Sequence, residues 1–157
     1  MAVRKPLVVV AGQVQQLQAG DSIANPITIS QTNDEAGAIV IGTPVYNDAL
    51  DGVKKAQANA AGTSKVLGLV ADVTVATGQP ANIQTGDVLA ATTAQWDAVA
   101  GTSGGLAFGV DYYLDPATSG KITSVATSTV GQLLVRIGRG ISTTELDIRI
   151  DPTTILM

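Results

Sequence analysis

Short runs of apolar and β-branched residues, separated by Gly, Pro, Asn, Asp and Ser, recur along the whole chain. The clearest runs lie near the C-terminus and predict strands at Val110–Leu114, Gln132–Ile137 and Glu145–Ile150. Gly120–Thr123 (GKIT) predicts a short further strand between them. β-Branched and aromatic residues favour strands, and turn signals about every 8–12 residues are typical of a β-sandwich or a β-barrel.

The same pattern continues upstream. Further strands are predicted at Asn25–Asn33, Ala38–Ile41, Thr43–Tyr46, Val53–Ala56, Lys65–Val75, Ala81–Gln84 and Val88–Ala91. The longest of them is expected to bend at Gly68. Asn47–Gly52 (NDALDG) predicts a hairpin loop in which Asp51-Gly52 supplies positive φ, and Gly138-Arg139-Gly140 predicts a bend between two strands.

No segment keeps apolar residues at i, i+3, i+4 and i+7 over a long stretch, so helices are expected to be few. One helical turn is predicted within Thr92–Ala98, capped by Thr93 and containing the single tryptophan, Trp96. The predicted fold class is therefore mostly β, a small β-sandwich or β-barrel.

The N-terminal residues 1–22 predict an extended arm or hairpin ahead of a β domain at 23–157. Leu7–Val10 suits a strand, Ala11-Gly12 a turn and Gln13–Leu17 a returning strand. Such strands are either buried on both faces or pair with another subunit. The apolar run Leu7–Ala11 is far short of the ~20 residues that span a bilayer, so we predict no membrane segment and no export signal.

Charge and composition exclude several classes of function. The net charge is −4 and the nine cations are scattered, which gives no basic face for nucleic acid. The chain has no cysteine and no histidine, and this removes Ser-His-Asp triads, Cys-His dyads and the usual zinc sites. We therefore predict no catalytic residues, no metal site and no cofactor.

The apolar residues are mostly Ala and Val, and aromatic residues make up only 3% of the chain. Such side chains fill a thin core, because burying Ala contributes clearly less than the roughly 1.5–3 kcal/mol of a buried Val or Leu. Small domains with lean cores often gain burial from a partner subunit. We therefore expect a homo-oligomer, with a trimer favoured over a dimer.

A few short patterns resemble catalytic or ligand-binding sites. Glu145 and Asp147 lie two residues apart on one strand face, as a glycosidase pair would, but a solvated face explains them better. Asn47–Gly52 lacks the remaining ligands of a calcium loop, and Gly120-Lys121 lacks the rest of a phosphate-binding loop. Tyr112-Tyr113 point to opposite faces of a strand, so at most one of them is exposed for stacking on a sugar.

The C-terminal half resembles a module of tailed-bacteriophage virion proteins, described as head decoration (cement) proteins, head fibres or tail-fibre segments. The matching residues are Trp96-Asp97, Gly105-Leu106, Gly109, Tyr112-Tyr113-Leu114, Gly120-Lys121, Gly131-Gln132, Gly138 and Thr144-Glu145-Leu146. Residues 5–21 also look like a phage structural segment, so the resemblance covers most of residues 5–150. Ala107-Phe108 and Gly140-Ile141 depart from the usual Thr-Pro and Ala-Leu.

This resemblance implies a non-enzymatic virion protein on the capsid surface, with the major capsid protein and further copies of the chain as its partners. Neither nucleic acid nor membrane is an expected partner. One alternative is a tail or head fibre anchored by residues 1–22. Another is a carbohydrate-binding domain that uses Trp96, Tyr112 or Tyr113 with Glu145 and Asp147.

Overall fold

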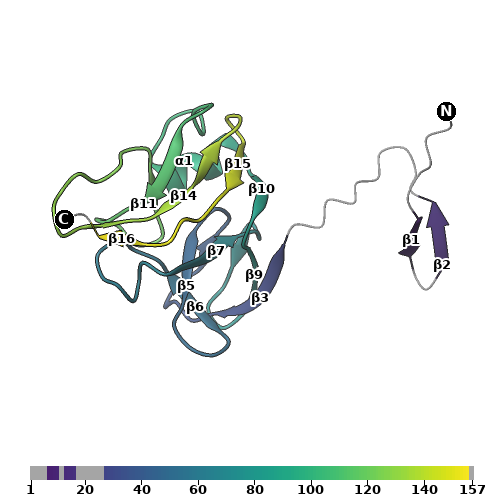
Figure 1. Ribbon diagram of the computed structural model, residues 1–157. Coiled ribbons are helices and arrows are strands. Elements are labelled where there is room, and N and C mark those ends of the chain that lie inside the picture. Colours follow the sequence, from purple (N-terminus) through teal and green to yellow (C-terminus); the bar gives the residue numbers. More distant parts are fainter. Residues whose placement is uncertain (1–6, 11–12, 17–26, 156–157) are drawn as a thin grey trace.

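The fold is mostly β, as predicted. The computed structural model describes residues 7–10, 13–16 and 27–155, and within these ranges it has sixteen strands and a single α-helix. Figure 1 shows the body of the molecule with β3 (Thr28–Asn33) on one side and β16 (Thr154–Ile155) on the other.

Residues 28–84 form a closed five-stranded β-barrel in the order β3-β6-β5-β7-β9. Its strands are β3 (Thr28–Asn33), β5 (Pro44–Asn47), β6 (Gly52–Lys55), β7 (Val66–Val70) and β9 (Pro80–Gln84). β3 is antiparallel to β9 and parallel to β6, and the remaining pairs are antiparallel. Next to Gly68, where a bend was predicted, the pairing of β7 with β5 shifts by one residue. Val45 pairs with Gly68, but Tyr46 pairs with Val66.

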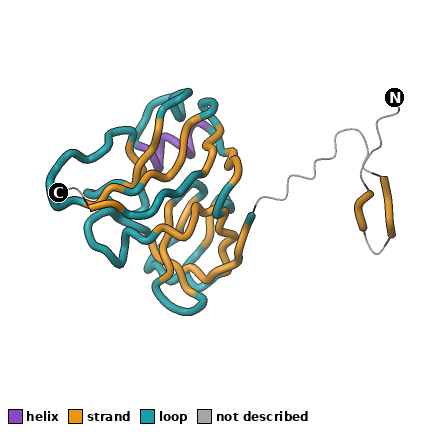
Figure 2. The backbone as a smooth tube through the Cα atoms, in the orientation of Figure 1, coloured by secondary structure: helices purple, strands orange, loops and turns teal. Residues whose placement is uncertain are grey.

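An antiparallel five-stranded sheet follows, in the order β10-β15-β14-β11-β12. Its strands are β10 (Asp87–Ala90), β11 (Asp111–Leu114), β12 (Ile122–Thr123), β14 (Arg136–Gly140) and β15 (Glu145–Ile148). The helix α1 (Thr93–Ala100) packs on one face of this sheet, as Figure 2 shows. Three of the four strands predicted in the C-terminal third are present as β11, β12 and β15, whereas the strand predicted at Gln132–Ile137 is split between β13 (Leu133–Leu134) and β14.

Three two-stranded sheets complete the structure. They pair β1 (Leu7–Val10) with β2 (Gln13–Gln16), β4 (Ile39–Val40) with β8 (Thr74–Val75), and β13 (Leu133–Leu134) with β16 (Thr154–Ile155). Both strands of the predicted N-terminal hairpin are therefore present. Its predicted turn at 11–12 and the first two residues of the strand predicted at Asn25–Asn33 lie outside the described residues.

Two hydrophobic cores hold the body together. The smaller core fills the barrel with Ile39, Val45, Val53, Val70, Val75, Ala81 and Ile83, which is the lean core that the composition predicts. The larger core lies between the sheet and the helix and is built from Leu and Ile around Trp96 and Tyr112. Ile41, Ala56, Ala58 and Leu69 from the barrel segment belong to this larger core, so the barrel and the sheet pack against each other.

Two of the predictions about glycine were wrong. Gly52 has no positive φ; a Cβ there would lie 1.7 Å from Asp34 Oδ2, so the exposed Asp34 side chain would have to move. Gly138 and Gly140 do not form a bend but lie inside β14, where a Cβ would come within 2.3 Å of Asp147 O and 2.4 Å of Ala107 O, respectively. In these places glycine permits close approach of a neighbouring group, and does not turn the chain.

The helix is longer than predicted and begins one residue earlier. Its N-cap is Thr92, which accepts a hydrogen bond from Gln95 N at 3.2 Å, while Gln95 Oε1 accepts from Thr92 N at 2.8 Å. This reciprocal capping box fixes the first turn, and Gly101 ends the helix in the left-handed conformation. Among the described residues, no helix has the length and apolar character needed to cross a membrane.

Replacing Thr92 with Ala removes this cap and is expected to lower the free energy of unfolding by about 1 kcal/mol. Thr93→Ala is the matched control, because Thr93 follows the cap and its hydroxyl takes no part in the capping box. Chemical denaturation of the two variants measures the difference. A larger loss for Thr93→Ala than for Thr92→Ala would contradict the assignment of the cap.

Candidate functional site

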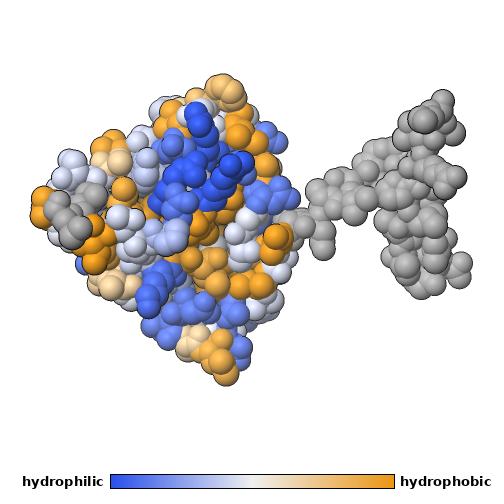
Figure 3. All heavy atoms as spheres, viewed as in Figure 1, coloured by the Kyte–Doolittle hydropathy of each residue, from blue (hydrophilic) through white to orange (hydrophobic). Residues whose placement is uncertain are grey.

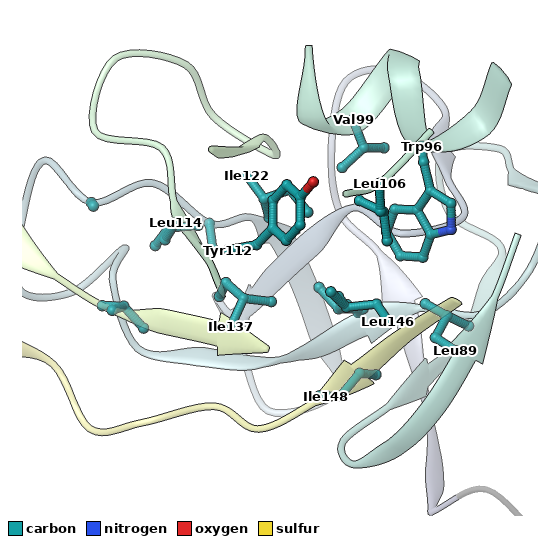
Figure 4. Close-up of a cluster of buried hydrophobic side chains, with 14 of the residues drawn as sticks. Leu89, Trp96, Val99, Leu106, Tyr112, Leu114, Ile122, Ile137, Leu146 and Ile148 are labelled. Atoms are coloured by element: carbon teal, nitrogen blue, oxygen red, sulfur yellow. The ribbon is translucent and has the colours of Figure 1, made fainter. Parts of the chain in front are cut away.

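Many of the residues that carry the phage resemblance in the C-terminal half lie in or beside the larger core. Figure 4 shows Trp96 and Val99 from α1 facing Leu106, Tyr112, Ile137 and Leu146. Trp96, Tyr112 and Leu146 are completely buried. Segments from Trp96 to Leu146 thus form one packed unit whose centre is apolar.

Trp96 is fixed both by hydrogen bonding and by packing. Its indole Nε1 donates to Thr144 O at 3.0 Å, which joins the helix to the loop before β15. Its ring lies against the backbone of Gly42, where a Cβ would come within 2.8 Å of Cζ3. Trp96 therefore connects the helix, the sheet and the barrel segment.

Tyr112 holds the loop at residues 107–110, where the sequence departs from the phage pattern. Its hydroxyl oxygen accepts a hydrogen bond from Ala107 N at 2.9 Å. Gly109 N donates to Gly140 O at 2.7 Å, and the intervening Phe108 is 82% exposed. The loop thus keeps its backbone connections and projects one aromatic side chain into solvent.

Asp97 organises the turn after the helix. Its carboxylate accepts hydrogen bonds from Gly105 N at 2.7 Å, Gly104 N at 3.0 Å and Thr102 Oγ1 at 2.9 Å. The hydrogen bond from Gly105 N, supported by those from Gly104 and Thr102, lowers the pKa of Asp97 below its usual value. A charged carboxylate is thus part of the folded loop.

The stability of the protein is expected to depend on pH through Asp97. Because its pKa is lowered by folding, its contribution is present above the unfolded pKa of about 3.9 and is lost as pH falls through the folded pKa. The difference in unfolding free energy between wild type and Asp97→Asn should therefore shrink between about pH 5 and pH 2. Thermal or urea unfolding across this range measures it, with Asp51→Asn on the exposed β5–β6 loop as the control for a lost carboxylate. A difference that does not change with pH would contradict this role.

Gly120-Lys121 has a structural role in this module. Gly120 has φ +72° and lies against Lys55 of the barrel, where a Cβ would come within 2.9 Å of Lys55 Cγ. Lys121 Nζ donates to Ala98 O in the last turn of α1. A cation at this end complements the helix dipole.

The residues proposed for sugar binding or glycoside hydrolysis do not form one site. Trp96 and Tyr112 have no exposed surface, so neither can stack on a sugar. Tyr113 is half-buried on the opposite face, which confirms the predicted alternation. Asp147 pairs with Arg149 at 2.8 Å, and Glu145 accepts a hydrogen bond from Ser142 Oγ at 3.2 Å.

The other sequence patterns are also accounted for. Asn47–Gly52 is the β5–β6 hairpin connection, as predicted, and Asp48 pairs with Lys54 at 2.7 Å. The hydrogen bond and charge of Asp48 raise the pKa of Lys54. In the part of the chain that the structure describes, no group of three acidic side chains is placed to hold a metal ion.

Sequence reasoning missed a charged row on the outer face of the sheet. The cross-strand partners Asp111–Arg139, Arg139–Asp147 and Asp147–Val88 run across four strands. Arg136 joins them by pairing with Asp111 at 2.8 Å, and this hydrogen bond raises the pKa of Arg136. Figure 3 shows a hydrophilic area over β14 and β15. Alternation within β15 was the only signal for it in the sequence.

Two open depressions lie next to residues already described, the larger beside Asp151, whose N–H donates to Arg136 O, and the smaller beside Lys121. The larger, of about 530 Å³, is lined by Asn47, 64–67 and 150–153. The smaller, of about 320 Å³, lies at the end of α1 and is lined by 98–101, Asp115, Thr118 and 121–123. Each contains one lysine and one aspartate, Lys65 with Asp151 and Lys121 with Asp115.

The chain was also compared with known proteins. No known family matches it, and no curated protein is significantly similar to it.

Proposed function

We propose that this chain is a non-enzymatic structural protein of a tailed-bacteriophage virion, bound to the outer surface of the capsid. Its partners are the major capsid protein and further copies of itself. The observation that carries the proposal is the role of the residues on which the phage resemblance rests. Trp96, Tyr112, Gly105 and Gly138 are all buried or in close backbone contact, so the shared pattern is that of a folded module.

A protein of this kind acts by occupying a repeated position on a shell. Each contact can be weak, because neighbouring copies on the shell raise the effective concentration of every binding surface. A rigid β body with two packed cores suits this role, since it holds its surfaces in fixed positions. The outer sheet face and the loop tip at Phe108 are surfaces that such a body presents.

A tail or head fibre is the second candidate, because β1 and β2 form a sheet of their own that can serve as an anchor. The two candidates differ in shape. A fibre is a long trimeric rod, whereas a decoration protein is compact. Sedimentation velocity of the purified protein separates them by the frictional ratio.

Binding to empty heads that lack this protein tests the proposal. Purified protein is mixed with such heads and sedimented; it is expected to bind to saturation at a fixed ratio to the major capsid protein. Heads that already carry the protein are the control and should bind no more. Failure to bind the heads, with binding to tails or fibres instead, would contradict the proposal.

A further inference from the structure

Among the described residues, β10 is an edge strand of the five-stranded sheet and pairs only with β15, so one of its sides is open. In the same ranges, β1 and β2 pair only with each other. β1 and β10 each contain four residues.

The free side of β10 can be identified from its hydrogen bonds. Ala91 N donates to Thr144 O, so Ala91, Leu89 and Asp87 direct their backbone groups toward β15. Val88 and Ala90 alternate with them and direct their N–H and C=O groups to the open side. Of these four groups, only Val88 N–H has a partner among the described residues, the side chain of Asp87 at 2.8 Å.

Asp87 is also the only described non-glycine residue with a positive φ, +68°. This conformation costs an L-residue free energy, which a local hydrogen bond from its own side chain offsets in part. Its carboxylate accepts a hydrogen bond from Val88 N–H, the first outward N–H of the edge, and leaves the N–H of Ala90 available for another strand. Neither proline nor lysine, the usual protections of an edge strand, occurs in β10.

The N-terminal hairpin, in turn, would be stabilised by a further strand. A two-stranded hairpin is marginally stable at best in water, and β1 consists of Leu-Val-Val-Val. Arg4 and Lys5 precede β1 closely in the sequence. Carboxylates lie at both ends of the β10 edge, Asp87 at its start and Glu145 opposite Ala90. The positive charges of Arg4 and Lys5 would therefore meet a negative charge in either orientation of the added strand.

We propose that the β1–β2 hairpin of one copy adds to the β10 edge of a second copy and extends its sheet. Addition of a strand to an open edge is a common mode of recognition, with backbone hydrogen bonds supplying the affinity. Val88, on the edge strand itself, is 38% exposed, and Ile27, just before β3, is 66% exposed. Ile27 O accepts from Thr85 N, two residues before β10, so the chain enters the body beside this edge. The inference deepens the homo-oligomeric part of the proposed function and is independent of the capsid contact.

Thiol cross-linking tests this directly, since the chain has no cysteine of its own. Full-length Val9→Cys protein is mixed with affinity-tagged Val88→Cys protein and treated with a short bis-maleimide. Tagged Leu50→Cys protein is the control, because Leu50 is 90% exposed on a loop of the barrel. The Val9–Val88 product is expected to exceed the Val9–Leu50 product by about tenfold or more, as local concentration within a complex far exceeds that in the mixture.

Ala90→Pro supplies the second measurement. It removes the outward N–H of the edge and leaves the ladder to β15 intact, so the circular dichroism spectrum and melting temperature should change little. Self-association, measured by sedimentation equilibrium, should weaken about tenfold or more.

Three results would overturn the inference. They are equal cross-linking at Val88 and Leu50, cross-linking within one chain of the Val9→Cys/Val88→Cys double variant regardless of dilution, and a monomer at all concentrations. None of these results bears on sedimentation with empty heads, so the two proposals fail separately.

Discussion

Replacing Trp96 with Ala is expected to lower the free energy of unfolding by about 3–5 kcal/mol, the cost of truncating a buried aromatic residue. Trp96 has no exposed surface and contacts residues from the helix, the sheet and the barrel segment. The substitution leaves a cavity between them and removes the hydrogen bond from Nε1 to Thr144 O. That carbonyl also accepts from Ala91 N, so the cavity, and not an unpaired carbonyl, should dominate the loss.

Phe108→Ala is the matched control, because it truncates another aromatic residue that is 82% exposed. It should change stability by no more than about 0.5 kcal/mol. Urea unfolding followed by circular dichroism measures both variants without using tryptophan fluorescence. Trp96→Phe should lie between Trp96→Ala and wild type. A Trp96→Ala protein as stable as wild type would contradict the placement of the indole at the centre of the core.

The second large effect is expected at Gly105. Gly104 and Gly105 have nearly the same φ, +88° and +89°, so replacing either with Ala forces an L-residue into the left-handed region. Their surroundings differ: a Cβ on Gly104 meets nothing within 4 Å, whereas one on Gly105 would lie 2.1 Å from Thr143 O. Gly104→Ala should cost about 1–2 kcal/mol through φ alone.

Gly105→Ala should cost clearly more, about 3 kcal/mol or above, because Thr143 is held by the hydrogen bond from Leu106 N and the loop must shift. The comparison therefore separates close packing from backbone conformation. Denaturant midpoints of the two variants, with unchanged m-values, measure it. Equal losses of stability in the two variants would contradict the close approach of Gly105 to Thr143 O.

Local sequence patterns predicted the strands well, because each strand is a short apolar run closed by turn residues. The hairpin around Asn47–Gly52 and the strands β11, β12 and β15 lie where these patterns place them, whereas the run Gln132–Ile137 divides between two sheets. The closure of residues 28–84 into a barrel could not be predicted, since it depends on β3 pairing with both β9 and β6. Such pairings join residues far apart in sequence, and periodicity carries no information about them.

The errors have a common physical origin. The predictions for Gly52, Gly138 and Gly140 considered only their own backbone freedom. In the structure, a neighbouring backbone carbonyl lies against Gly138 and Gly140, and the Asp34 side chain lies against Gly52. The charged row was missed because a register shift between Tyr112 and Tyr113 places Arg136 and Arg139 on one face. A β-bulge of this kind changes the alternation on which face predictions depend.

Only part of the candidate site could be predicted from the sequence. The opposite faces of Tyr112 and Tyr113 follow from strand alternation and are confirmed, and the structure also buries Trp96 completely. The open β10 edge could not be predicted, because no local pattern shows which strand ends a sheet. It emerges only from the strand order and from the hydrogen bond of Ala91 to Thr144.

Cryo-electron microscopy of intact virions tests the central proposal most directly. We predict density on the outer surface of the capsid, at repeated positions, into which the five-stranded barrel and the five-stranded sheet with its single helix can be built. Location of this chain in the tail or in fibres, or its absence from purified particles, would contradict the account.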